Sequence, residues 1–249
     1  MGMNVLPESC IAKILSLTSP RDACRLSSVS RIFRSAAESD DVWNKFLPPE
    51  LPAEVPEYPS RKDLFFGLSN DPLLIHQGRM SFSLERSSGK KCYMISPRAL
   101  RIAWGDDPRY WRWISLPDSR FEEVAELDIV WWFDISGRMD TSLLSDNTLY
   151  GAYLVFDLTP NAYGFREAVE STVKTADNIQ HSRVYLSQNP RGEGGSRRDG
   201  WSEAKLGCFF NGGGGGDEGE VEIRLCETRN LHAKEGLIVH GIEIRPSSS

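Results

Sequence analysis

The chain has 249 residues, enough for one large domain or two small ones that bury a core without disulfide bonds. Lysine and arginine number 29 against 35 aspartates and glutamates, and the resulting net charge of -6 argues against a general binder of nucleic acid or of anionic membranes. The five cysteines lack the paired spacing of a zinc site, so we expect reduced core residues and no bound metal.

The N-terminus has no basic segment followed by an apolar stretch, and the longest apolar runs have the length of strands. Secretion and membrane spanning are therefore not expected, and the sequence favours the cytoplasm and the nucleus as its location.

Residues 6 to 47 show the apolar spacing of several short helices. Two sets of apolar residues share a helical face: Ile11, Ile14 and Leu15, and then Leu26, Val29 and Phe33. Ser19 is expected to cap a helix whose first residue is Pro20, with Asp22 near the positive end of the helix dipole. A second helix start is expected at Asp40 or Asp41.

Residues 47 to 60 contain five prolines in fourteen positions, which excludes a helix and favours an extended, stiff connection. The following stretch, RKDLFFGLS, predicts one more short helix. We therefore expect a helical domain over residues 1–48, a linker with a short helix over 49–79, and a second domain over 80–249.

In the second domain, apolar and polar residues alternate along the chain, which is typical of strands. In ELDIVWWFDIS (126–136), the alternation predicts Trp131 in a core and Trp132 on the opposite face. Four further segments have strand character and are separated by turn residues: 149–158, 181–187, 220–227 and 237–246. The expected fold class is α+β and multidomain, with short N-terminal helices followed by an antiparallel β-sandwich.

Two glycine-rich stretches look like loops. NGGGGGDEGE (211–220) lacks the Lys-Ser/Thr of a phosphate loop, so a flexible hairpin loop is expected. The other stretch contains Arg197 and Arg198 together with Glu193 and Asp199. We expect these side chains to form a solvated charge cluster.

The helical region resembles an F-box over about forty residues. The resemblance rests on the order and spacing of LP (6–7), the helix with Ile11, Ile14 and Leu15, SPRD (19–22), VSR (29–31), FR (33–34) and Trp43. It implies docking to the Skp-type adaptor of SCF ubiquitin ligases. The residues expected at that contact are Leu6, Pro7, Ile11, Leu15, Pro20 and Val29. The alternative is a set of helices that only packs against the sandwich.

Residues 80 to 246 resemble a phloem protein 2 or Nictaba-type lectin domain. The matching segments are GKKCY (89–93), LRIAW (100–104), YW and Trp113 (110–113), VAEL (124–127) and GIEIRP (241–246). The resemblance implies a jelly-roll-like sandwich that binds glycans containing N-acetylglucosamine. It also implies a binding pair of tryptophans seven positions apart, which here are Trp104 and Trp111.

A sugar presents an apolar C–H face flanked by hydroxyls, so a lectin needs an aromatic platform with polar groups at its rim. WGDDPRYW (104–111) can supply both, with Asp106, Asp107 and Arg109 as hydrogen-bonding partners. Trp104 also ends an apolar strand and could instead be a core residue. Trp113 is expected in the interior.

Neither an enzyme nor a cofactor is expected, because the four histidines show no HExxH spacing and no GxSxG motif occurs. The favoured interpretation is a substrate receptor of a ubiquitin ligase whose sandwich selects a glycan on the target. One rival has the sandwich recognise a protein surface, with Trp104 and Trp111 in the core. Another is a glycan hydrolase, which needs two carboxylates about 5 to 10 Å apart.

Overall fold

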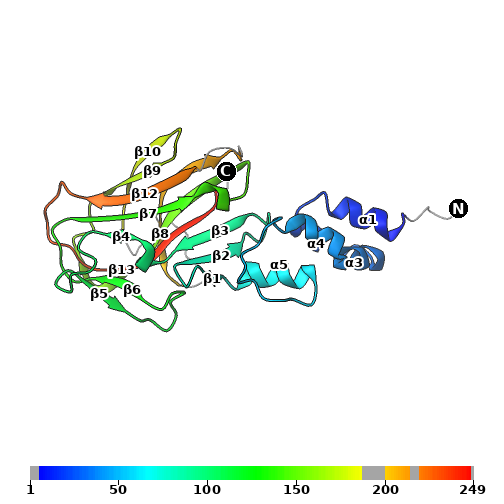
Figure 1. The fold of residues 1–249 in the computed structure, drawn as a ribbon, viewed down its shortest axis with the longest axis horizontal. Helices are drawn as coiled ribbons and strands as arrows, with labels where there is room; N and C mark the ends of the chain where they lie inside the picture. The colour runs from blue at the N-terminus through cyan, green and yellow to red at the C-terminus, as the bar shows by residue number, and fades with distance from the viewer. Residues whose placement is uncertain (1–5, 187–199, 214–218, 248–249) are drawn as a thin grey trace. The chain divides into compact units, whose positions relative to one another are not determined.

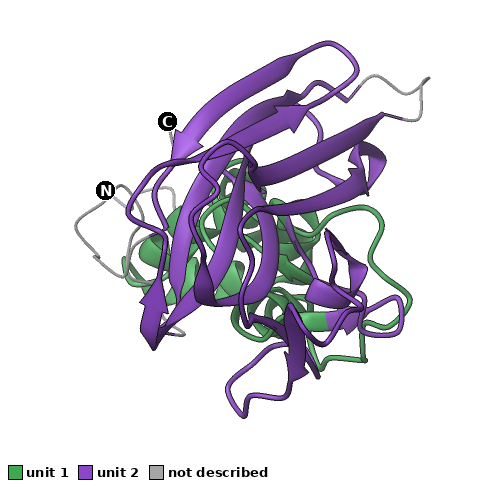
Figure 2. Cartoon of the chain, turned by 90° about the vertical axis from the view of Figure 1, so that its left-hand side faces the viewer, with its two compact units in different colours: residues 1–73, 82–91 green, residues 74–81, 92–249 purple. Residues whose placement is uncertain are grey.

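The computed structural model describes residues 6–186, 200–213 and 219–247 (Figure 1). The chain divides into two compact units, coloured separately in Figure 2. Unit 1 comprises Met1–Leu73 and Phe82–Lys91, and unit 2 comprises Leu74–Ser81 and Cys92–Ser249. Among the described residues, no helix has the length and apolar character needed to cross a membrane.

Unit 1 contains short helices, and those after α1 begin at serine caps. The helices are α1 (Glu8–Leu15), α2 (Pro20–Leu26), α3 (Arg31–Glu38), α4 (Asp40–Phe46) and α5 (Arg61–Asn70). Ser19 accepts a hydrogen bond from the Asp22 N–H at the start of α2, and Ser39 does the same for α4 from Asp41. The predicted helix starts at Ser19 and Asp40 are thereby confirmed, because capping depends on local sequence.

The core of unit 1 is built around Trp43, which is fully buried and donates a hydrogen bond from Nε1 to the Ala37 carbonyl at 2.7 Å. Its ring centroid lies 5.2 Å from those of both Phe65 and Phe66 of α5. Residues 48–60 contain neither helix nor strand, as the prolines predicted. They join helices of one unit, however, so the compact units differ from the expected division at residues 48 and 79.

The strands form two β-sheets, which belong to unit 2 apart from Leu73, residues 82–84 and Lys91 of the first three strands. The strands are β1 (Leu73–Ile75), β2 (Met80–Leu84), β3 (Lys91–Ile95), β4 (Arg101–Ile102), β5 (Trp111–Ile114), β6 (Val124–Leu127), β7 (Phe133–Asp140), β8 (Thr148–Tyr163), β9 (Val169–Lys174), β10 (Ile179–Val184), β11 (Ser202–Asn211), β12 (Glu220–Glu227) and β13 (Glu235–Pro246). The larger sheet has the order β1-β2-β3-β13-β6-β5, with β8 pairing to both β13 and β11. The smaller sheet has the order β10-β9-β12-β7-β4.

The two sheets pack face to face. Buried residues alternate along β7 and β12, and the inward side chains Val221, Ile223 and Leu225 of β12 are fully buried, as their spacing predicted. The hydroxyl of Ser171 on β9 donates across the sheets to the Leu206 carbonyl of β11 at 2.8 Å. With antiparallel pairing between the long strands, these contacts confirm the antiparallel sandwich that was expected after the N-terminal helices.

The predicted single strand over residues 126–136 is wrong. β6 of the larger sheet ends at Leu127 and β7 of the smaller sheet begins at Phe133, so the chain changes sheets between them. The alternation does not continue through this crossing: Val130 is buried, whereas Trp131 is 53% exposed and is not the core residue that was expected.

The two glycine-rich stretches lie partly or wholly outside the described residues. Residues 214–218 and the pair Arg197 and Arg198 are among those not described. Residues 211–220 join β11 to β12, which belong to different sheets. The stretch is therefore a connection between sheets and not the hairpin loop that was expected.

Candidate functional site

A tight turn between β4 and β5 places Trp104 at the surface of unit 2. The turn is closed by hydrogen bonds from Gly105 N to Ile102 O at 3.0 Å and from Asp107 N to Trp104 O at 2.9 Å. Trp104 has a φ of 63°, a left-handed conformation that bulky residues rarely adopt. Its side chain is 52% exposed, so the strained turn presents a large apolar ring to solvent.

Two neighbouring rings hold Trp104 in place. Its ring centroid lies 5.7 Å from that of Tyr110 and 5.9 Å from that of Trp132, in tilted or edge-on arrangements. Such geometry is favourable between aromatic rings. We call Trp104, Tyr110 and Trp132 the Trp104 cluster. It forms a braced aromatic surface whose most exposed member is Trp104.

Trp111 does not offer a second platform, contrary to expectation. It is the first residue of β5, and its side chain is only 1% exposed. Its Nε1 donates to the Ala103 carbonyl at 3.1 Å. A ring this deeply buried has no open face for a ligand, so Trp111 instead supports the turn that carries Trp104.

Trp113 supports the same turn from a half-buried position, and is less enclosed than was expected. Its Nε1 donates to the Gly105 carbonyl at 2.8 Å. The Arg98 guanidinium lies 3.7 Å from the centre of the ring. The indole N–H groups of Trp111 and Trp113, both on β5, therefore donate to two backbone carbonyls of the turn that carries Trp104.

Polar groups lie on the same turn. Arg109 donates to both carboxylate oxygens of Asp107, from Nε at 3.0 Å and from Nη2 at 2.6 Å. These hydrogen bonds hold the pKa of Asp107 below its usual range, so that it stays ionised. The guanidinium also lies 5.4 Å from the Tyr110 ring, whereas Asp106 is simply exposed. The turn thus combines an exposed ring with donors and acceptors.

The segment between β6 and β7 positions Trp132 against Trp104. Asp128 donates from its backbone N–H to the Tyr110 carbonyl at 2.9 Å. Val130 and Lys234 exchange two backbone hydrogen bonds, at 3.0 and 2.7 Å. Two separate segments therefore form the Trp104 cluster, and the segment before β13 pairs with the second of them beside Trp132. The sequence did not indicate this because these contacts join distant segments.

The buried Lys234 side chain stabilises the backbone on both sides of this pairing. It is 2% exposed and forms an ion pair with Glu227 at 2.7 Å. Its ammonium also donates to backbone carbonyls of Asn230, His232 and Trp131. A lysine is rarely buried unless it is paired, and nothing in the sequence singles this one out. Lys234 therefore fixes the backbone beside Trp132.

The exposed apolar residues of unit 1 differ from those expected at a partner contact. Ile11, Leu15 and Pro20 are buried within the unit, so they stabilise its core and are unavailable to a partner. Leu6, Pro7 and Val29 are exposed. Ile14 and Leu17 are exposed as well, and neither was among the residues expected at the contact. Leu6, Ile14, Leu17 and Val29 are named here the apolar set of unit 1.

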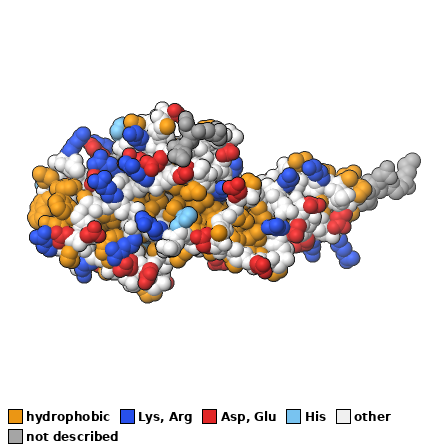
Figure 3. Space-filling model, viewed as in Figure 1, with side chains coloured by type: hydrophobic (Ala, Val, Ile, Leu, Met, Phe, Trp, Pro, Cys, Tyr) orange, Lys and Arg blue, Asp and Glu red, His pale blue; other side chains and the backbone are white. Residues whose placement is uncertain are grey.

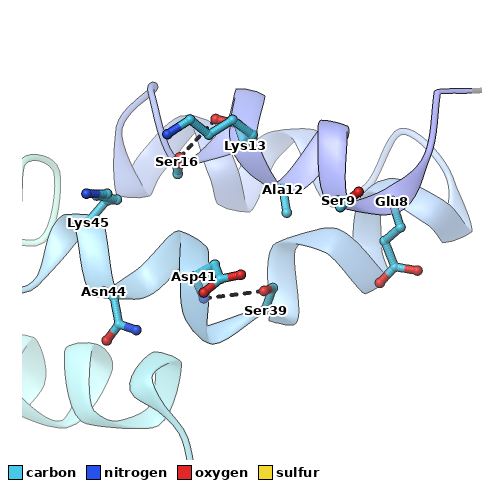
Figure 4. Close-up of a pocket in the computed structure, with 9 residues that line it drawn as sticks. All are labelled: Glu8, Ser9, Ala12, Lys13, Ser16, Ser39, Asp41, Asn44 and Lys45. Atoms are coloured by element: carbon cyan, nitrogen blue, oxygen red, sulfur yellow. Dashed lines mark hydrogen bonds between the residues drawn. The ribbon is translucent and has the colours of Figure 1, made fainter.

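A groove of about 650 Å³ lies between α1 and α4 (Figure 4). Its lining is mostly polar: Glu8, Ser9, Ala12, Lys13, Ser16, Ser39, Asp41, Asn44 and Lys45. Two carboxylates and two ammonium groups are present, so the groove favours neither charge. Within the described residues, no group of three His, Cys, Asp or Glu side chains could hold a metal ion.

Comparison with known families assigns both regions. Residues 3–45 match the F-box domain and residues 90–246 match Phloem protein 2. This chain belongs to the F-box proteins with a phloem protein 2 domain. F-box protein PP2-B10 of Arabidopsis thaliana is 44% identical over 252 residues, covering 97% of this chain and 93% of its own. F-box protein PP2-B1 of the same plant is 40% identical over 303 residues, covering 99% and 90%.

Among solved structures, a family 35 carbohydrate binding module from Clostridium thermocellum is similar, with 8% identity and a TM-score of 0.36. The match covers 63% of this chain and 98% of that module. At these values the likeness carries no argument about function. The family match places the chain among non-enzymatic adaptors, which removes the glycan hydrolase alternative. The apolar set lies in the F-box region and the Trp104 cluster in the phloem protein 2 region.

Proposed function

We propose that this F-box protein is the substrate-recognition subunit of an SCF-type ubiquitin ligase in the cytoplasm and the nucleus. The F-box docks a Skp-type adaptor, and the sandwich binds an N-acetylglucosamine-containing glycan on the target. The observation that carries the proposal is the presence, in one chain, of an F-box with exposed apolar residues and a sandwich with an exposed, braced tryptophan.

The adaptor contact is assigned to the apolar set of unit 1. Covering a side chain of this size contributes about 1.5 to 3 kcal/mol when it is fully buried. Leu17, at 74% exposure, has the most apolar surface to lose to a partner. Pro7 lies exposed next to Leu6 and extends this surface.

The glycan contact is assigned to the Trp104 cluster. The Trp104 ring stacks on the C–H face of a sugar, while Asp107, Arg109 and Asp106 exchange hydrogen bonds with its hydroxyl or acetamido groups. Because Asp107 and Arg109 already orient each other, little side-chain freedom is lost on binding. The chain then acts by proximity, since it raises the effective concentration of target lysines near the ligase.

Replacing Leu17 and Val29 together by aspartate is expected to weaken adaptor binding by at least roughly 100-fold, or about 2.7 kcal/mol. Both side chains are exposed, so folding should be unaffected while the partner would have to bury two charges. Titration of the purified adaptor measures the effect. The matched control, Ile179→Asp with Phe210→Asp, introduces the same charges at exposed apolar positions of unit 2 and should bind normally. Equal losses of adaptor affinity in both variants, or no loss in either, would contradict the assignment.

A further inference from the structure

A second exposed apolar surface lies at the end of the sandwich that carries the Trp104 cluster. Three segments that pass from one sheet to the other are hydrogen-bonded together at this end: residues 103–110, 128–132 and 228–234. Trp131 and Leu231 lie on the second and third of them and are 53% and 61% exposed. Figure 3 shows hydrophobic side chains gathered where Figure 1 draws the connection from β12 to β13. Trp131 and Leu231 are named here the end patch.

The backbones on both sides of the end patch are fixed by one buried side chain. The Lys234 ammonium donates to the Trp131 carbonyl at 3.2 Å. It also donates, at 2.8 Å, to the carbonyls of Asn230 and His232, the two chain neighbours of Leu231. Carbonyls of both segments therefore surround a single atom. Because the two backbones are held in place before any partner arrives, little freedom is lost when the end patch is covered.

The end patch adjoins the proposed glycan site. Trp131 directly precedes Trp132, a member of the Trp104 cluster. The Trp132 ring centroid lies 5.9 Å from that of Trp104. A molecule held at the Trp104 cluster therefore has the end patch as its neighbour, and a part of that molecule that extends past Trp132 meets Trp131 first.

The chemistry of the end patch suits a polypeptide better than another sugar. Polar side chains next to it already have partners: Asn230 donates to Glu167, and Arg229 pairs with Glu170 at 2.9 Å. The exposed His232 adds one polar group beside the aliphatic member of the patch. A sugar needs an aromatic platform with several polar groups at its rim, whereas an apolar peptide side chain needs only an apolar surface that excludes water. Exposed apolar surface next to a polar binding site is typical of protein contacts.

We propose that the end patch binds an apolar segment of the target polypeptide, beside the glycan held by the Trp104 cluster. This inference rests on the proposed glycan-binding function, because the bound sugar brings its attached polypeptide to this end of the sandwich. Sugar and polypeptide are covalently joined, so the second contact forms within an existing complex and adds to the affinity of the first. The chain therefore selects targets that carry both the glycan and an apolar sequence next to it.

The test compares two synthetic peptides that carry the same N-acetylglucosamine oligosaccharide on a central asparagine. One has leucine and phenylalanine on both sides of that asparagine, and the other has serine and glycine there. In calorimetric titration, the intact chain is expected to bind the apolar glycopeptide at least roughly tenfold more tightly. The variant Trp131→Ala with Leu231→Ser should bind the two glycopeptides equally. It should bind the free oligosaccharide as the intact chain does.

The matched control is Tyr185→Ala with Ile179→Ser, which removes an exposed aromatic and an exposed aliphatic side chain elsewhere in unit 2. It should keep the preference for the apolar glycopeptide. If the double variant of the end patch does not fold, as judged by thermal unfolding, Leu231→Ser alone replaces it, and the preference should fall by about threefold.

Three results would overturn the proposal. They are equal binding of the two glycopeptides by the intact chain, an undiminished preference in the end-patch variant, and equal losses in that variant and the control. Sedimentation of the intact chain adds a fourth: self-association that the end-patch variant abolishes would assign the end patch to a second copy of the chain.

The apolar peptide without its sugar separates this inference from the proposed function. If the intact chain binds no free oligosaccharide, the glycan assignment is wrong, and the unglycosylated peptide decides the role of the end patch. Saturable binding that is lost in Trp131→Ala with Leu231→Ser would support a polypeptide contact there. Absence of such binding, together with absence of sugar binding, would overturn the inference as well.

Discussion

Replacing Trp111 by alanine is expected to lower the free energy of unfolding of unit 2 by about 3–5 kcal/mol. The side chain is 1% exposed, so its removal leaves a buried cavity and deprives the Ala103 carbonyl of its indole donor. The turn that carries Trp104 loses one of its two supports at the same time. Circular dichroism during urea unfolding of the intact chain measures the change without relying on tryptophan fluorescence.

The matched comparison is Trp104→Ala, which removes the same side chain from a position that is 52% exposed. That variant should lose less than about 1 kcal/mol, as is usual for surface substitutions. If Trp111→Ala lowered the free energy of unfolding no more than Trp104→Ala does, the assignment of Trp111 as a support of the turn and of Trp104 as an exposed platform would be wrong.

Replacing Lys234 by alanine is expected to cost about 3–5 kcal/mol, because it leaves the buried Glu227 carboxylate without its ion-pair partner. The carbonyls of Asn230, His232 and Trp131 also lose a donor. Thermal and urea unfolding measure the loss. The double variant Lys234→Met with Glu227→Gln removes both charges and should recover part of the stability, whereas Lys205→Ala, at an exposed position, should have little effect.

Because of the same ion pair, we expect the stability of the fold to depend on pH. Burial alone would raise the pKa of Glu227, but Lys234 and the backbone N–H groups of Arg229 and Asn230 outweigh it, and the pKa lies below its ordinary value of 4.5. A lowered pKa in the folded state stabilises the fold at pH values above 4.5, and this contribution is lost as the pH falls below that value. The double variant should therefore lose less stability than the intact chain between neutral pH and acid. Identical acid sensitivity would show that the pair does not act in this way.

Features set by neighbouring residues were predictable from the sequence. Ser19 and Pro20 begin a helix because capping involves only the first helical turn. The alternation of β12 placed Val221, Ile223 and Leu225 correctly because one face of that strand is covered along its whole length. The prolines of residues 47–60 excluded regular structure for a similar local reason.

Features that depend on distant contacts were not predictable. Trp104 and Trp111 are the same residue type on one short segment. Trp104 lies in a turn with a left-handed backbone and is exposed, whereas Trp111 lies in β5 and is buried. In unit 1, helical spacing identified Ile11, Ile14 and Leu15 as one apolar set. It could not show that Ile14 faces solvent while the other two are buried. Trp131 was misplaced because the chain changes sheets beside it.

The most direct test of the proposed glycan site is calorimetric titration of an N-acetylglucosamine oligosaccharide into the intact chain and into Trp104→Ala. We expect saturable binding by the intact chain, at least a tenfold loss in Trp104→Ala, and an unchanged melting temperature. Phe210→Ala, which removes an aromatic ring that is 62% exposed elsewhere in unit 2, should bind normally. Undiminished binding by a folded Trp104→Ala variant, or no binding of the sugar by the intact chain, would contradict the account.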